Sequence, residues 1–186
     1  MGITAYGRVR DWKRALSLLK EMRKRGVAPE STTFNAAISA CGKGRQWQRA
    51  LSLLDEMRER GVTPDVISFN AAISACEKGG KWERALSLLD EMRARGVTPN
   101  VISFNAAISA CEKGGKWEQA LSLLDEMRER GVTPQVISFS AAISACEKGG
   151  QWERALALLE EMPGKGVQPD VITYAATVQA LSLIHI

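Results

Sequence analysis

The stretch that decides the fold is Val66-Ile-Ser-Phe-Asn-Ala-Ala-Ile-Ser-Ala-Cys-Glu-Lys-Gly-Gly-Lys-Trp-Glu-Arg-Ala-Leu-Ser-Leu-Leu-Asp-Glu-Met-Arg-Ala-Arg-Gly-Val-Thr-Pro-Asn100. It returns at once at residues 101–135, where 32 of 35 positions are identical. The differences are Arg84/Gln119, Ala94/Glu129 and Asn100/Gln135. The cysteines and tryptophans recur with the same 35-residue spacing along the chain. The chain is therefore an array of repeats.

We divide the chain into four full repeats with a partial repeat at each end. The full repeats are residues 31–65, 66–100, 101–135 and 136–170, and the partial ones are residues 1–30 and 171–186. Residues 181–186, Leu-Ser-Leu-Ile-His-Ile, depart from the repeat and match the translation of a transposon-end adapter used in sequencing libraries. We therefore expect a truncated fragment with a non-native tail at residues 181–186.

The first half of a repeat predicts a thin, nearly uncharged helix over residues 66–77. Its larger apolar residues Phe69, Ile73 and Cys76 follow the i, i+4, i+7 spacing of a buried helix face, and small alanines between them allow close packing. The Lys-Gly-Gly sequence at residues 78–80 is expected to end this helix.

The second half predicts a charged amphipathic helix over residues 81–95. Its apolar stripe runs from Trp82 to Met92, and acidic and basic residues occupy the other faces. Gly96 suits the left-handed conformation that ends a helix, and Pro99 prevents any continuation. Each repeat is thus expected to form a helical hairpin.

A single hairpin cannot bury its apolar stripes, whereas stacked copies share a continuous core. We therefore expect an all-α fold, a right-handed superhelical α-solenoid of helix-turn-helix repeats. The first helices should line one wall and the charged second helices the other.

Composition and motifs exclude several classes of function. The 186 residues carry 25 Lys and Arg against 21 Asp and Glu, and the net charge of +4 permits a polyanionic partner without requiring one. No apolar run has the length of a membrane span, so no membrane partner is expected. The cysteines lack the short spacing of zinc or redox motifs, and no nucleophile with a base or phosphate loop is found. We expect no enzyme activity, metal or cofactor.

The repeat resembles the pentatricopeptide repeat along its whole length. It shares the Ala-Leu pair, the Glu-Met near the end of the second helix and the closing Gly-Val-Thr-Pro, and its 35-residue period separates it from the slightly shorter tetratricopeptide repeat. Tryptophan at the start of the second helix departs from the commoner Leu or Ile, and we expect it in the core. The resemblance implies sequence-specific binding of single-stranded RNA, about one base per repeat, in a mitochondrion or plastid.

The resemblance also implies that the fifth and the last residue of each repeat read the base edge. These pairs are Asn35 with Asp65, Asn70 with Asn100, Asn105 with Gln135, and Ser140 with Asp170. By the family code they resemble, in order, a uridine reader, a pyrimidine reader, a reader with no assignment and a guanosine reader. The alternative is that these positions hold ordinary polar residues at a helix start, repeated by duplication.

Two further positions complete the implied site. The second residue of a repeat would pack beside the base, and a lysine after the first helix would face the phosphate. The first set is Thr32, Ile67, Ile102 and Ile137, and the second set is Lys43, Lys78, Lys113 and Lys148. The alternatives are that the isoleucines pack between helices and that the lysines only balance the helix C-termini.

A different class of function is a tetratricopeptide-like scaffold for protein–protein interactions. A peptide groove needs varied side chains at many wall positions, whereas variation here concentrates at the fifth and last residues of the repeats. We therefore favour an RNA-binding adaptor in RNA processing, stability, splicing or editing, with other RNA-processing proteins as further partners. The unpaired last helix, with Ile172, Tyr174 and Val178, predicts end-to-end self-association.

Overall fold

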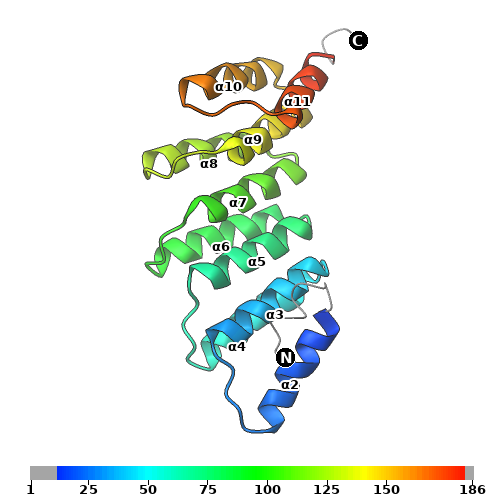
Figure 1. Cartoon of the computed structure of the whole chain (residues 1–186), viewed down its shortest axis with the longest axis vertical. Coiled ribbons are helices and arrows are strands. Elements are labelled where there is room, and N and C mark those ends of the chain that lie inside the picture. Colours follow the sequence, from blue (N-terminus) through cyan, green and yellow to red (C-terminus); the bar gives the residue numbers. More distant parts are fainter. Residues whose placement is uncertain (1–11, 183–186) are drawn as a thin grey trace. The chain divides into compact units, whose positions relative to one another are not determined.

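The computed structural model describes residues 12–182, in which every regular element is an α-helix (Figure 1). The first helices of the repeats are α3 (Ser31–Lys43), α5 (Val66–Lys78), α7 (Val101–Lys113), α9 (Val136–Lys148) and α11 (Val171–Ser182). The second helices are α2 (Trp12–Lys24), α4 (Trp47–Glu59), α6 (Trp82–Ala94), α8 (Trp117–Glu129) and α10 (Trp152–Gly164). The predicted helices at residues 66–77 and 81–95 therefore differ from α5 and α6 by one residue at three of their ends. The start of the first partial repeat and the end of the tail lie outside the described residues.

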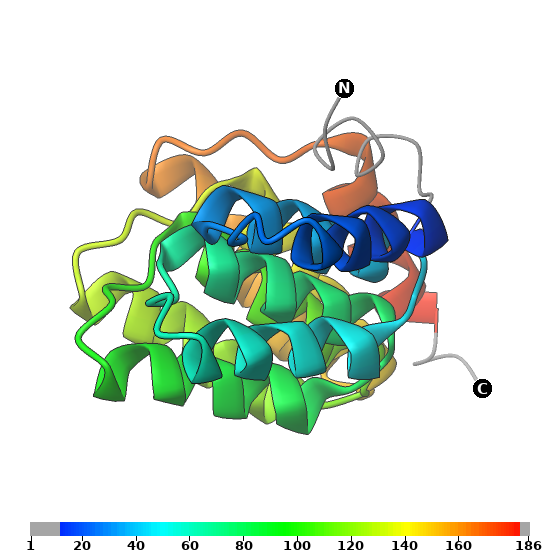
Figure 2. The same cartoon turned by 90° about the horizontal axis from the view of Figure 1, so that it is seen from below.

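The helices form two compact bodies, Met1–Pro99 and Asn100–Ile186. In the first body α3 packs against α2, α4 and α5, and α5 also packs against α4 and α6. In the second body α9 packs against α7, α8, α10 and α11. Each of these first helices therefore contacts both its hairpin partner and the neighbouring repeat, as Figures 1 and 2 show within each body.

The core repeats with the period of the sequence. Phenylalanine and isoleucine from the first helices and methionine from the second helices are fully buried: Phe34, Phe69, Phe104, Phe139, Ile38, Ile73, Ile108, Ile143, Met57, Met92, Met127 and Met162. The four cysteines are also buried and free, and burial raises the pKa of each thiol to about 11. At neutral pH they are therefore protonated packing residues, as the sequence predicts.

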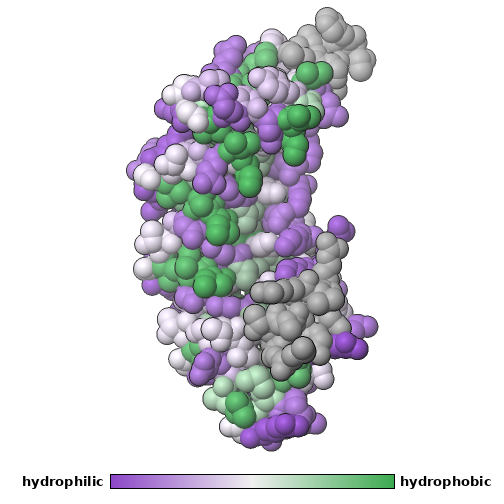
Figure 3. All heavy atoms as spheres, in the orientation of Figure 1, coloured by the Kyte–Doolittle hydropathy of each residue, from purple (hydrophilic) through white to green (hydrophobic). Residues whose placement is uncertain are grey.

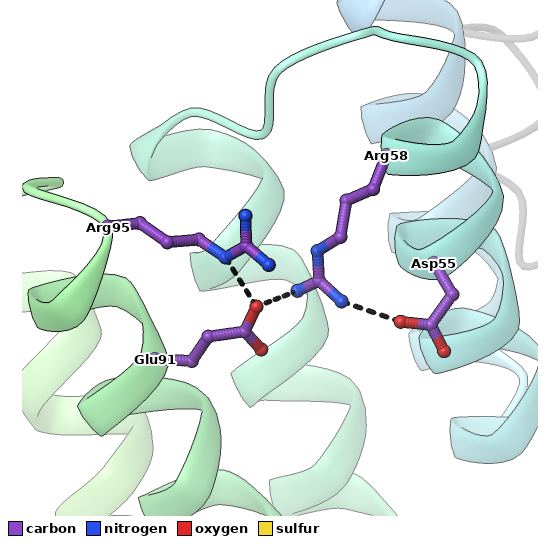
Figure 4. Close-up of polar contacts among 4 residues, drawn as sticks. All are labelled: Asp55, Arg58, Glu91 and Arg95. Atoms are coloured by element: carbon purple, nitrogen blue, oxygen red, sulfur yellow. Dashed lines mark hydrogen bonds and ion pairs between the residues drawn. The ribbon is translucent and has the colours of Figure 1, made fainter.

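The second helices are joined by a ladder of ion pairs. In the first body the Arg58 guanidinium lies 2.6 Å from Asp55 on its own helix and 2.7 Å from Glu91 on the next second helix (Figure 4). Glu91 in turn accepts a hydrogen bond from Arg95 at 2.6 Å. In the second body Arg128 joins Asp125 to Glu161 in the same way. Because each arginine bridges two helices, the ladder fixes how neighbouring hairpins align along their axes.

The tryptophans do not lie in the core as expected; they are half-buried at the junction between repeats. A Cβ atom added to Gly79, at the end of α5, would come within 2.5 Å of Cδ1 of Trp47 from the preceding repeat. Gly44 lies in the same way against Trp12. A cation also lies near the Trp12 ring, since the guanidinium carbon of Arg49 is 4.2 Å from the ring centre.

The turn after each second helix leads directly into the first helix of the next repeat. Gly96 adopts φ 73°, the left-handed conformation that the sequence predicts for it. Its neighbour Val97 donates a backbone hydrogen bond to Met92, which satisfies a carbonyl at the helix end. Pro99 is buried and directly precedes Asn100, which is the N-cap of α7. The last residue of a repeat is therefore also the first capping residue of the next helix.

Candidate functional site

An exposed apolar side chain stands at the second position of successive first helices. Ile67, Ile102 and Ile137 are 60%, 59% and 64% exposed, and Thr32 is also exposed at the equivalent position. Burial between helices is therefore excluded as the role of these isoleucines. Figure 3 shows that hydrophobic side chains do reach the surface among hydrophilic ones. An exposed aliphatic residue repeated in this way offers a flat base a place to lie.

The first pair of predicted base-reading residues is in direct contact. The Asn35 amide donates a hydrogen bond of 3.3 Å to Oδ1 of Asp65. Asp65 caps α5, because the same oxygen accepts the backbone N–H of Ser68 at 2.9 Å. Burial acts to raise the pKa of Asp65, but the hydrogen bonds from Ser68 and Asn35 outweigh it and hold the pKa below its usual value. Asp65 is therefore a carboxylate that both caps a helix and accepts the amide of Asn35. Asn35 itself is buried, and its Oδ1 atom has no hydrogen-bond partner among the described residues.

The last two pairs are joined through a hydroxyl of the following helix. The Ser138 hydroxyl donates to Oδ1 of Asn105 at 2.6 Å and accepts the backbone N–H of Gln135 at 3.0 Å. Ser140 lies 2.8 Å from the hydroxyl of Thr173. Thr173 donates to Asp170 at 2.6 Å.

Two hydrogen bonds from Thr173 lower the pKa of Asp170, and the bond from the side chain has a larger effect than the bond from the backbone. Asp170 is therefore ionised at neutral pH and accepts both groups. The remaining pair is divided between the bodies: Asn70 is half-exposed on α5, and Asn100 accepts the backbone N–H groups of Ile102 and Ser103 as the N-cap of α7.

The four predicted phosphate-facing lysines end the first helices, but their surroundings differ. Lys148 forms an ion pair with Glu112 of the preceding repeat. Lys78 is exposed, and no carboxylate among the described residues pairs with it. The equivalent of Glu112 in the repeat before Lys78 is Gly42. Lys43 and Lys113 complete the set, and each has further interactions.

Sequence reasoning missed the hydroxyl at the third position of each first helix. Ser68, Ser103, Ser138 and Thr173 are fully buried, although serine and threonine are usually exposed. A hydroxyl three residues after an N-cap is a known partner in helix capping, and this spacing was the available signal. It did not show that the hydroxyls of Ser138 and Thr173 also reach Asn105 and Ser140, the fifth residues of the preceding repeats.

Comparison with protein families decides what the repeat is. The pentatricopeptide repeat domain matches residues 52–114 and 87–151, and two further descriptions of the same repeat match residues 3–43, 134–182 and 32–62. The chain belongs to the pentatricopeptide repeat family. A comparison with curated proteins found no match.

Solved pentatricopeptide repeat structures resemble this chain closely. The maize protein PPR10 in complex with an 18-nt psaJ RNA element is 29% identical, with a TM-score of 0.84 over 98% of this chain. The chain spans only 27% of the length of PPR10. This likeness confirms the predicted all-α solenoid class built from helical-hairpin repeats.

Two ribonuclease P proteins of Arabidopsis thaliana share the fold. The pentatricopeptide repeat domain of protein-only RNase P 1, solved in complex with tRNA, is 18% identical, with a TM-score of 0.81 over 97% of this chain and 95% of that domain. Nuclear RNase P 2 is 13% identical, with a TM-score of 0.80 over 97% of this chain and 40% of that protein. Pentatricopeptide repeats thus also occur as parts of enzymes.

Two other kinds of site are absent from the described part of the chain. No helix there has the length and apolar character needed to cross a membrane. Within the same residues no group of His, Cys, Asp and Glu side chains is arranged to hold a metal ion.

Proposed function

We propose that this chain binds single-stranded RNA, about one base per pentatricopeptide repeat, as an adaptor in organellar RNA metabolism. The observation that carries the proposal is the paired arrangement of Asn35 and Asp65 at 3.3 Å, next to an exposed residue at the second position of the helix. Amide and carboxylate groups at a fixed spacing suit the edge of an unstacked base, and the second-position side chain suits its face. A mitochondrion or plastid is the proposed location, by family resemblance.

The proposed repeats are residues 31–65, 66–100, 101–135 and 136–170, flanked by partial repeats. With the N-terminus toward the 5′ end, their readers should favour the order 5′-U-pyrimidine-pyrimidine-G-3′. RNA is favoured over a bound peptide because the exposed positions repeat almost unchanged, which suits the repeating backbone of a nucleic acid.

The test is a titration of the full chain with labelled RNA. An oligonucleotide containing U-C-C-G should bind more tightly than poly(A) of equal length, and duplex RNA should bind weakest. Stacking contributes about 1–3 kcal/mol per base before ordering and association costs, so micromolar affinity is expected for four bases. Fluorescence anisotropy measures these constants, and equal affinity for all three RNAs would refute the proposal.

A second prediction concerns phosphate contact and salt. Lys78→Ala should weaken binding of every RNA alike and lower the slope of log K against log salt by roughly 0.7, because one phosphate contact to a single strand is lost. Glu112→Gln should instead strengthen binding of every RNA and raise the salt slope, because it releases Lys148 from its ion pair.

The matched control for this pair is Glu118→Gln, which removes an exposed carboxylate from the second helix α8. It changes the net charge as Glu112→Gln does, but it frees no lysine at the end of a first helix. Titrations at several salt concentrations separate the two effects. If the two glutamine variants raise affinity equally, the gain comes from net charge and Lys148 is not a phosphate ligand.

A further inference from the structure

The exposed faces of the second helices differ in charge, although their buried faces repeat. Helix α2 carries five basic residues and one acidic residue, whereas α8 carries one basic residue and four acidic residues. The difference is concentrated at three positions of the repeat. At these positions α2 has Lys13, Lys20 and Lys24, and α8 has Glu118, Asp125 and Glu129. The same part of the repeat therefore has opposite charge in the two bodies.

The three positions lie on one face of each helix. Their spacing of i, i+7 and i+11 corresponds to about two and about three helical turns. All six charged side chains are exposed. A small exposed residue, Ser17 in α2 and Ser122 in α8, follows the first charge by one turn. Each helix therefore presents a straight row of charges, with a serine within it that lets another helix approach closely.

These charges are available to a partner outside the chain. Among the described residues, no hydrogen bond or ion pair involves the side chains of Lys20, Lys24, Glu118 and Glu129. Asp125 pairs with Arg128 at 2.7 Å, but its side chain remains 65% exposed. The two rows therefore contribute little to the fold of their own chain, unlike the arginines of the ion-pair ladder.

A groove lies beside the charged row on α8. It has a volume of about 620 Å³ and runs between α8 and α10. Trp117 and Leu121, both half-buried, give the groove an apolar part, and the three acidic residues of the row form one of its walls. A basic helix with a small residue in its exposed face matches this groove in shape and in charge.

The chain itself contains such a helix. The row on α2 has the same spacing as the row on α8, so three oppositely charged pairs can form in one register when the two helices are parallel. The other second helices match α2 less well, because each has an acidic residue at only two of the three positions. The third position is occupied by Gln48 in α4, Ala94 in α6 and Gly164 in α10.

We infer that this protein self-associates, with the lysine row on α2 of one copy docked against the groove beside α8 of a second copy. The two surfaces differ, so each docked copy still offers one free surface of each kind to the assembly, which can grow beyond a dimer. Exposed ion pairs are weak and are screened by salt, so the association is weak and falls as salt is raised. The contact uses the second helices, whereas the proposed RNA site uses the first helices, and the inference is independent of RNA binding.

The test is sedimentation velocity of the full chain from low to high micromolar concentration. The sedimentation coefficient should rise with concentration, and raising NaCl from about 50 to about 500 mM should reverse the rise. Two double variants, Lys13→Glu with Lys24→Glu and Glu118→Lys with Glu129→Lys, should each weaken the association roughly tenfold or more, because two attractive pairs become repulsive.

The matched control is Arg45→Glu with Lys165→Glu. Both residues are exposed in turns outside the second helices, and the control changes the net charge as the α2 double variant does. It should not weaken the association. The decisive variant combines all four exchanges on α2 and α8. It keeps the net charge of +4 and exchanges the signs of both rows, so it should associate as the unaltered chain does.

A second measurement serves if circular dichroism shows that a charge-reversed variant does not fold. Lys24→Gln and Glu129→Gln should each weaken the association, and combining them should add little, because either change already removes the pair. Equal and additive effects of the two glutamine substitutions would show that the residues do not meet.

Three further results would overturn the inference. The first is a strictly monomeric unaltered chain at high micromolar concentration and low salt. The second is association that neither salt nor the exchanges weaken, which would indicate apolar end-to-end contact through residues such as Tyr174 and Val178. The third is a loss of RNA affinity without loss of association in Lys13→Glu with Lys24→Glu, which would assign the row on α2 to the RNA backbone. A folded fourfold variant that stays monomeric would equally refute the docking of these two rows.

Discussion

Phe139→Ala is expected to lower the free energy of unfolding by about 3–5 kcal/mol, the cost of truncating a fully buried aromatic side chain. Phe139 is completely enclosed in the second body, and the guanidinium of Arg128 lies 5.7 Å from the centre of its ring. The variant removes both the apolar burial and the surface on which the arginine rests. Urea unfolding followed by far-UV circular dichroism measures the loss.

The matched control lies two residues away on the same helix. Ile137 is 64% exposed, so Ile137→Ala should change the stability by less than about 0.5 kcal/mol. Under the proposed function, Ile137→Ala should nevertheless weaken RNA binding several-fold, because the apolar contact with the base is lost. If Ile137→Ala destabilised the protein as much as Phe139→Ala, the isoleucine would be a packing residue and its place in the site would be wrong.

Gly79→Ala should destabilise the first body by about 1–3 kcal/mol, because overpacking forces a side chain off its preferred position. The added methyl group would lie 2.5 Å from Cδ1 of Trp47, so the indole ring has to move. Gly79 has φ −87°, a value open to alanine, and the expected loss therefore comes from the contact alone. Thermal unfolding measures it.

A double-mutant cycle with Trp47→Leu isolates this contact. Leucine lacks the ring atoms that meet the new methyl group, so Gly79→Ala should cost much less in the Trp47→Leu background. Gly164→Ala is the control, since no atom lies within 4 Å of the position at which its Cβ would stand. It should be neutral or slightly stabilising, because alanine favours a helix more than glycine does. An equal cost of Gly79→Ala in both backgrounds would show that the tryptophan is not the obstacle.

Much of the fold was predictable because it depends on local periodicity. The i, i+4, i+7 spacing of Phe69, Ile73 and Cys76 identified a buried face, and all three residues are fully buried. Gly96 was recognised because a left-handed residue ends a helix, and it has φ 73°. Such features depend on a residue and its neighbours in the chain, and a single repeat is enough to reveal them.

The features that were not predictable depend on the alignment of one repeat against the next. The apolar stripe of the second helix predicts that Trp47 points toward the core. Whether its ring is enclosed, however, depends on the approach of Gly79 from the following repeat. The same holds for Lys148, whose ion pair is made with Glu112 of the preceding repeat. Helical periodicity carries no information about this offset, so the tryptophans were placed too deep and the lysines were treated as equivalent.

The ion-pair ladder also bears on how such an array can grow. The hydrogen bonds from Arg23 to Glu56 and from Arg128 to Glu161 both join residues 33 positions apart, so the two halves of each rung come from consecutive repeats. A gene duplication of one 35-residue period recreates the same rung at the new junction, wherever within the period the breakpoints fall. Unequal crossing-over can therefore lengthen the array without any need for a new interface between repeats. The proposed base-reading pair, at the fifth and last positions of a repeat, can then change without loss of a rung, because the ladder joins residues of the second helices.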